Sequence, residues 1–155
     1  MKYGTYEMAL KYDKQGKIAE WLQLFLRNDG HNTALAEGLL REERCYIGLR
    51  QLPLALLDGI KSGAPEYLRD QDSIEYFFQV VDKMKQAHGS WDIPPLIVEY
   101  VENRFQVNDG RHRLEMYRQM GIAQAPAVLW TTGEPMRDRL LKLLEESSHN
   151  EKNGG

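Results

Sequence analysis

The spacing of apolar residues changes several times along this chain, and each change marks the border of a predicted element. Stretches in which apolar residues recur at every third or fourth position predict amphipathic helices. Short apolar or alternating runs bounded by Gly, Pro, Asn or Asp predict strands. The predicted helices cover about residues 6–27, 33–40, 72–89, 111–120 and 135–144. The predicted strands cover about residues 44–49, 96–101, 104–108 and 125–130, with a further helical turn at 54–60.

The order of these elements predicts an α+β fold. Glu102 and Asn103 fit the tip of a hairpin that pairs strands 96–101 and 104–108. The helix after this hairpin leads to strand 125–130, and it is expected to form a βαβ-type crossover that covers one face of a sheet. We therefore expect a sheet of about four strands packed with helices.

Local signals place the ends of several predicted elements. Asn32 or Thr33 can cap the second helix with its side-chain oxygen. Asp72 predicts the N-cap of the third helix, which is expected to pack on the sheet. The last residues, SSHNEKNGG at 147–155, are polar and end in glycine, so they predict a disordered tail.

Composition and charge exclude several classes of protein. A length of 155 residues favours one domain, and a net charge of -3 argues against a protein that coats nucleic acid through bulk charge. The single cysteine, Cys45, excludes an internal disulfide and a multi-cysteine metal site. No apolar run is long enough for a membrane span, and the N-terminal residues lack the apolar core of a signal peptide. We therefore expect a cytoplasmic protein with no membrane partner and no metal site.

The candidate chemistry lies where a predicted strand ends and the fourth helix begins. A tight turn at this point aims the first backbone N–H groups of the helix, and the positive end of its dipole, at one spot. The sequence adds two guanidiniums and an imidazole there, so the spot suits an anion and above all a phosphate. The predicted phosphate- or nucleotide-binding residues are Asn108, Asp109, Gly110, Arg111, His112 and Arg113.

A simpler interpretation of the same cluster competes with the anion site. Arg111, His112 and Arg113 can be solvated residues of a first helical turn that pair with Asp109 or Glu115. Cations at a helix N-terminus oppose the helix dipole, however, so three in a row lower stability unless something negative binds. The charge pattern alone leaves both interpretations open.

Four short motifs resemble a known family. They are PLIV at 95–98, NDGRHRL at 108–114, GI at 121–122 and PAV at 126–128. Together they are similar to the ParB N-terminal domain-like group of the ParB/sulfiredoxin superfamily. The resemblance implies a small mixed sheet packed with helices over residues 44–146. Residues 1–43 are expected to form an added helical extension packed on that core.

The resemblance also implies a ligand. In nucleotide-binding members of the superfamily, a Gly-x-x-Arg turn at a helix start holds phosphates, and in this chain that turn is Gly110 to Arg113. The implied cofactors are CTP, ATP or ADP with magnesium. The members include partition proteins that bind and hydrolyse CTP, so a nucleotide-dependent role in DNA maintenance or in a mobile element is expected. DNA is a second implied partner, with less support from the sequence than a nucleotide.

Departures from the family pattern limit the predicted chemistry. Arg111 stands where a sulfiredoxin has its reactive cysteine, so sulfiredoxin activity is not expected. Free-serine kinases have an acidic residue just after the first strand's proline, whereas Leu54 follows Pro53 here. A nucleotide hydrolase or a small-molecule phosphotransferase using Asp109 or His112 as acid or base remains an alternative. A non-catalytic module that binds DNA or protein is the other alternative.

Overall fold

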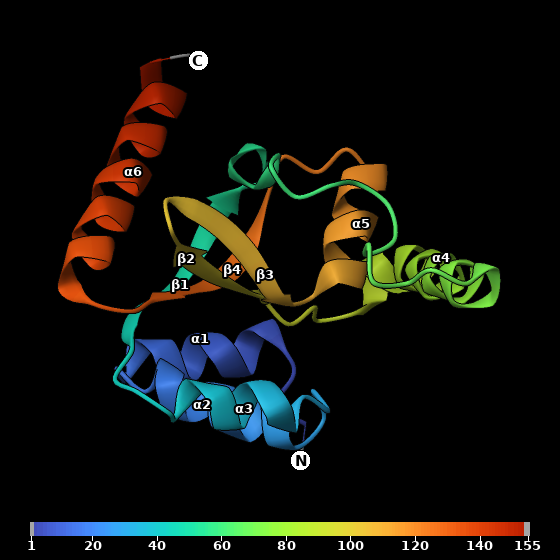
Figure 1. Ribbon diagram of the computed structural model, residues 1–155, viewed down its shortest axis with the longest axis horizontal. Helices are drawn as coiled ribbons and strands as arrows, with labels where there is room; N and C mark the ends of the chain where they lie inside the picture. The colour runs from blue at the N-terminus through green and yellow to red at the C-terminus, as the bar shows by residue number, and fades with distance from the viewer. Residues whose placement is uncertain (1, 154–155) are drawn as a thin grey trace.

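The computed structural model describes residues 2–153, with side chains placed as far as residue 148. Its helices and strands form an α+β fold, which confirms the predicted class (Figure 1). The elements are α1 (Tyr6–Lys14), α2 (Ile18–Arg27), α3 (Thr33–Leu39), β1 (Cys45–Pro53), the 3-10 helix η1 (Leu54–Leu57), α4 (Gln71–Ala87), the 3-10 helix η2 (His88–Ser90), β2 (Leu96–Val101), β3 (Arg104–Asp109), α5 (Arg111–Gln119), β4 (Gln124–Thr131) and α6 (Glu134–Asn153).

The four strands form one mixed sheet in the order β1-β4-β2-β3. Strands β2 and β3 form the predicted antiparallel hairpin, and both tip residues, Glu102 and Asn103, have positive φ as a tight two-residue turn requires. Strand β4 is parallel to β2 and antiparallel to β1. The predicted crossover therefore joins β2 to its parallel neighbour β4, and along the chain this connection contains β3 and α5. Pro53 ends β1 at the sheet edge, where its missing N–H is tolerated.

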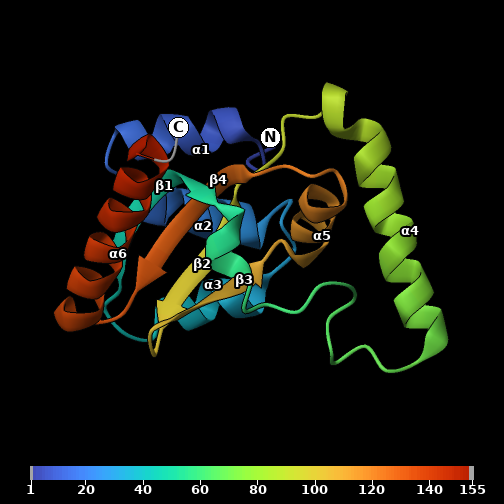
Figure 2. The same cartoon turned by 90° about the horizontal axis from the view of Figure 1, so that it is seen from above.

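The helices α1, α2 and α3 cover one face of the sheet (Figures 1 and 2). Trp21 and Leu22 of α2 are fully buried and pack with Ile97, Val128 and Trp130 of the sheet. The side chains of alternate residues along β2 and β4 point to this face, as the period of a strand requires. The N-terminal helices thus form one of the two hydrophobic core clusters together with this face of the sheet.

The predicted single helix over residues 6–27 is wrong, because the chain breaks it into α1 and α2. Gly16 has φ of 72°, in the left-handed region that glycine adopts readily. The N–H of Lys17 donates to the Tyr12 carbonyl at 2.8 Å, which closes the end of α1. Helix α2 can then fold back against α1, and both helices reach the sheet.

The opposite face of the sheet packs against η1, α5 and the first half of α6. Leu96, Val98 and Leu129 of the sheet share a core with Leu114 of α5 and Leu140 of α6. Helix α4 lies outside this layer and packs along α5 (Figure 2), so the prediction that it packs on the sheet is wrong.

The ends of α4 and α6 differ from the predictions. Helix α4 is capped by Asp70 rather than Asp72, since the Asp70 carboxylate accepts from the Ser73 N–H at 2.9 Å. Helix α6 continues through Asn153, so residues 147–153 are helical where the sequence predicts a disordered tail. The stretch 136–153 contains no proline or glycine that would stop a helix. Residues 154–155 lie outside the described part of the chain.

None of the helices between residues 2 and 153 is long and apolar enough to cross a membrane.

Candidate functional site

Gly110 sits in the turn between β3 and α5 as the N-cap residue of the helix. Its φ is 111°, and an added Cβ would lie 2.7 Å from Leu96 Cδ2 and 2.8 Å from the Arg113 guanidinium. Only glycine fits such a position. The first intrahelical bond runs from the Leu114 N–H to the Gly110 carbonyl at 2.8 Å. The N–H groups before it have no intrahelical partner, and within residues 2–153 no side chain caps this helix end.

Arg113 is buried beneath the turn, with 5% of its surface exposed. Its Nη1 donates to the Pro94 carbonyl at 2.9 Å and to the Pro95 carbonyl at 3.3 Å. Its Nη2 donates to Asp109 Oδ2 at 2.9 Å. Burial lowers the pKa of this guanidinium, and the Asp109 charge opposes that shift. Arg113 pairs with Asp109, as the simpler interpretation proposed, but it is buried and links this carboxylate to the backbone of Pro94 and Pro95.

Asp109 and Asn108 connect the turn to the N-terminal helices and to the sheet. Asp109 Oδ1 accepts from Asn32 Nδ2 at 3.2 Å, and Asn32 also caps α3 through the Leu35 N–H. Asn108 Oδ1 accepts from Trp130 Nε1 at 2.9 Å. Both carboxylate oxygens of Asp109 therefore have donors. The Asn32 cap of α3 confirms the sequence prediction, whereas the Asn32–Asp109 and Trp130–Asn108 bonds join residues far apart in sequence and left no signal there.

His112 lies beside the turn with its ring stacked on Phe77 of α4, at a centroid distance of 4.5 Å. Burial lowers the pKa of this imidazole below 6.5; the nearby Arg113 charge lowers it further, and Asp109 opposes both effects. His112 is therefore neutral at neutral pH. It contributes a polar ring to the site rather than a cation.

We expect the stability of the protein to fall as the pH drops below about 6.5, in part because of His112. Its pKa is lower in the folded state than in the unfolded state, so the folded state binds fewer protons in this range. The stabilisation is fully present above pH 6.5 and is lost as the pH falls toward the folded-state pKa. Urea unfolding at several pH values measures it. His112→Gln should show a smaller loss, and equal pH dependence of the two proteins would contradict this role.

Three polar side chains of α5 hold the segment that follows η1. Arg111 Nη2 donates to the Lys61 carbonyl at 3.4 Å, and Glu115 Oε2 accepts from the Gly63 N–H at 2.9 Å. Arg118 Nη2 donates to the Leu57 carbonyl at 2.8 Å. The long Arg111 contact is weak, and its side chain is only partly buried. Arg111 is thus the cation of the predicted cluster that can reorient toward a ligand.

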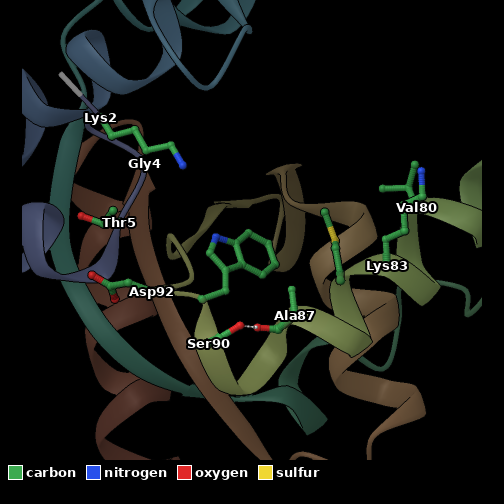
Figure 3. A pocket seen from close by; sticks show the side chains of 10 residues that line it. Lys2, Gly4, Thr5, Val80, Lys83, Ala87, Ser90 and Asp92 are labelled. Carbon is green, nitrogen blue, oxygen red and sulfur yellow. Dashed lines mark hydrogen bonds between the residues drawn. The ribbon is translucent and has the colours of Figure 1, made fainter.

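One cavity lies beside the turn, and a second cavity shares four of its lining residues. The first, of about 330 Å³, is lined by Lys2, Gly4, Phe25, Asp29, Gly30, Met84, Trp91, Pro94, Asp109, Gly110, His112 and Arg113. The second, of about 620 Å³, is lined by Lys2, Gly4, Thr5, Val80, Lys83, Met84, Ala87, Ser90, Trp91 and Asp92 (Figure 3). Lys2, Gly4, Met84 and Trp91 line both. The sequence did not reveal these four, because they come from separate segments and form no motif.

Of the predicted site residues, Asp109, Gly110, His112 and Arg113 line the first cavity. Asn108 is instead engaged with Trp130 and Glu99 on the sheet. Among the residues that the structure describes, no three His, Cys, Asp or Glu side chains lie close enough together to hold a metal ion. The phosphate-binding role of the turn stays a prediction.

Comparison with known proteins shows a distant likeness to a solved structure. No family model and no curated protein matches the chain. The solved structure of sulfiredoxin from Arabidopsis thaliana matches with 19% identity and a TM-score of 0.31, covering 52% of this chain and 82% of the sulfiredoxin. A likeness this weak carries no argument about a site or an activity, so the chemistry rests on the residues of this chain. The protein is similar to a sulfiredoxin only as a distant structural match.

Proposed function

We propose that the start of α5 binds a phosphate group of a small phosphorylated ligand. The observation that carries this proposal is the uncapped N-terminus of α5 beside a cavity of about 330 Å³ that Gly110 itself lines. Backbone N–H groups and the positive end of a helix dipole favour an anion at this place. The absence of a Cβ at Gly110 makes room for Leu96 and the Arg113 guanidinium beneath the turn, so the chain can turn sharply at this point.

The side chains around the turn support an anion site in separate ways. Arg113 holds the turn in shape from below, because its donors face Pro94, Pro95 and Asp109. Lys2 lines the cavity, and Arg111 can leave its weak contact with the Lys61 carbonyl. Of these two side chains, Lys2 lines the cavity, whereas Arg111 lies outside its lining and would reach a ligand only after it reorients.

Two carboxylates also line this cavity, and both are already bonded. Asp29 accepts from the N–H groups of Tyr3 and Gly4, and Asp109 accepts from Asn32 and Arg113. Bonded carboxylates repel an incoming phosphate less than free ones. Asp109 is also a poor general base in this arrangement. The neutral imidazole of His112 is the remaining candidate for proton transfer, and the geometry supports binding more than catalysis.

The ligand class that we propose is a nucleotide such as CTP, ATP or ADP, with magnesium carried by the nucleotide. A nucleotide-dependent role in DNA maintenance or in a mobile element rests on the resemblance of the Gly110–Arg113 turn to ParB-like proteins. The phosphate of such a ligand would occupy the first cavity, and the second cavity offers space for the rest of the nucleotide.

Titration of the isotope-labelled protein with pyrophosphate tests the phosphate site. We expect the amide NMR signals of Arg111, His112 and Arg113 to shift. The start of α4 should not shift, because Asp70 caps it and it lies outside both cavities. Sodium chloride at equal ionic strength controls for screening.

Arg111→Gln should weaken pyrophosphate binding by roughly fivefold to tenfold, since a charge-assisted bond from a partly exposed arginine is lost. No shift at the start of α5 with millimolar pyrophosphate would contradict the proposed function.

A further inference from the structure

We infer that Lys2 and Trp91 form a second compartment of the ligand site, which takes a flat ring carried by the phosphorylated ligand. The inference rests on the proposed function for the phosphate end and adds the other end of the ligand. Its basis is that the two cavities are lined by the same Lys2, Gly4, Met84 and Trp91. A ligand whose phosphate lies at Gly110 can therefore extend past Trp91 into the larger cavity.

The larger cavity has the lining that a ring requires. Met84 and Val80 of α4, with Ala87 and Trp91, contribute apolar surface. The walls of binding pockets for small molecules are mostly apolar, with a few polar groups that orient the ligand. The face of an indole ring also stacks on aromatic rings of a ligand whichever base or substituents they carry.

Charge is placed on two sides of this cavity. Figure 3 shows Lys2 entering from the N-terminal segment and Lys83 coming from α4 on the opposite side. Lys2 lines both cavities and thus stands where ring and phosphate of one ligand would be joined. A neutral apolar ligand would give Lys2 and Lys83 no anionic partner, so a phosphorylated ring compound fits this cavity better.

The N-terminal segment that carries Lys2 is firmly anchored. The Asp29 carboxylate accepts from the Tyr3 N–H at 3.1 Å and from the Gly4 N–H at 2.6 Å. Trp21 Nε1 donates to the Tyr3 carbonyl at 2.8 Å. A Cβ on Gly4 would come within 2.6 Å of the Phe25 ring, so this segment lies as close to α2 as a chain can. The backbone of Lys2 is therefore held in place, because the two residues that follow it, Tyr3 and Gly4, are hydrogen-bonded to Asp29 and Trp21.

The connector that carries Trp91 is tied on both sides. Ser90 Oγ donates to the Ala87 carbonyl at 3.2 Å, which holds the connector to the end of α4. Asp92 Oδ2 accepts from the Glu7 N–H at 3.2 Å, which holds it to the first turn of α1. Trp91 is thus positioned by both the N-terminal helices and α4, and the compartment exists only because these elements meet.

Calorimetry with the full chain and three probes, pyrophosphate, ADP and CDP, tests the ring compartment. We expect the tighter of the two nucleotides to bind about tenfold or more tightly than pyrophosphate, as stacking on an aromatic ring provides. Trp91→Ala should remove this advantage by weakening nucleotide binding much more than pyrophosphate binding, whereas Trp91→Phe should keep most of it. The phenylalanine variant separates a lost stacking face from a damaged fold.

Lys2→Gln should weaken nucleotide and pyrophosphate binding alike by at least threefold, as an order-of-magnitude expectation for one lost charge contact. Lys14→Gln is the matched control, since Lys14 is an exposed lysine at the end of α1 outside both cavities. It should change neither affinity.

The results separate this inference from the proposed function. If pyrophosphate binds but both nucleotides bind no tighter, with Trp91→Ala neutral, the ring compartment is wrong and the phosphate site stands. If a nucleotide binds in a Trp91-dependent way without shifts at the start of α5, the ring compartment stands and the phosphate site is wrong. If no probe binds, both are wrong.

Discussion

Replacing Arg113 by alanine should lower the free energy of unfolding by about 3–5 kcal/mol, because removing one partner of a buried ion pair strands the other. The guanidinium has three acceptors within hydrogen-bond distance: the Pro94 and Pro95 carbonyls and Asp109 Oδ2. Alanine would leave two carbonyls without this donor and a carboxylate without its cation. It would also empty the space beneath the Gly110 turn.

Guanidinium chloride unfolding measures this loss, and two variants show its origin. Arg111→Ala removes a neighbouring arginine that is only partly buried, and it should change stability by no more than roughly 0.5 kcal/mol, as surface substitutions usually do. Arg113→Lys keeps the charge but cannot reach three acceptors with one compact ammonium, so we expect an intermediate loss. A loss below about 1 kcal/mol for Arg113→Ala would contradict the buried role.

This result would also divide the predicted cation cluster into two kinds of residue. A destabilised Arg113→Ala protein with a stable Arg111→Ala counterpart would show that Arg113 builds the turn and that Arg111 is free to bind. Helix dipoles disfavour cations at N-termini, yet Arg113 is held there by Asp109 and by two backbone carbonyls. The unfavourable placement of cations at this helix N-terminus had predicted an external anion. Groups of the protein itself compensate part of that positive charge.

Local patterns predicted the strand, turn and helix around Gly110, because each depends on neighbours in sequence. Asn103 at the hairpin tip, Gly110 in the turn and Gly121 after α5 are residue types that adopt positive φ readily, and each marks the end of an element. The burial of individual side chains could not be predicted from local patterns in the same way. A sequence shows that Arg113 starts a helix, but not that Pro94 and Pro95 offer their carbonyls to it.

The cavities were also beyond local patterns. Lys2, Asp29 and Trp91 lie far from Gly110 in sequence, and each looks ordinary in its own segment. Trp91 belongs to a connector, and the N-terminal helices were expected as an extension packed on a core. Gly16 was overlooked as the break that lets α1 and α2 fold back. Long-range packing decided these features, and periodicity carries no information about which faces meet.

Truncating Trp21 to alanine should lower the free energy of unfolding by about 3–5 kcal/mol, the usual result for a large aromatic residue in a core. Trp21 is fully buried, its ring stacks on Phe25 at a centroid distance of 5.0 Å, and its Nε1 bonds to the Tyr3 carbonyl. Urea unfolding followed by circular dichroism measures the loss. Glu20→Ala, an exposed neighbour in α2, should stay within roughly 0.5 kcal/mol of the original protein.

The shape of the transition matters as much as its midpoint. If α1–α3 were a separate extension, Trp21→Ala would lower one step of unfolding and leave the other unchanged. The contacts of α2 with Ile97, Val128 and Trp130, and the bond from Asn32 to Asp109, make these helices part of the main core and of the turn. We therefore expect one cooperative transition shifted as a whole, with altered amide signals at Gly110. Two separate transitions would show instead that the sheet folds without its N-terminal helices.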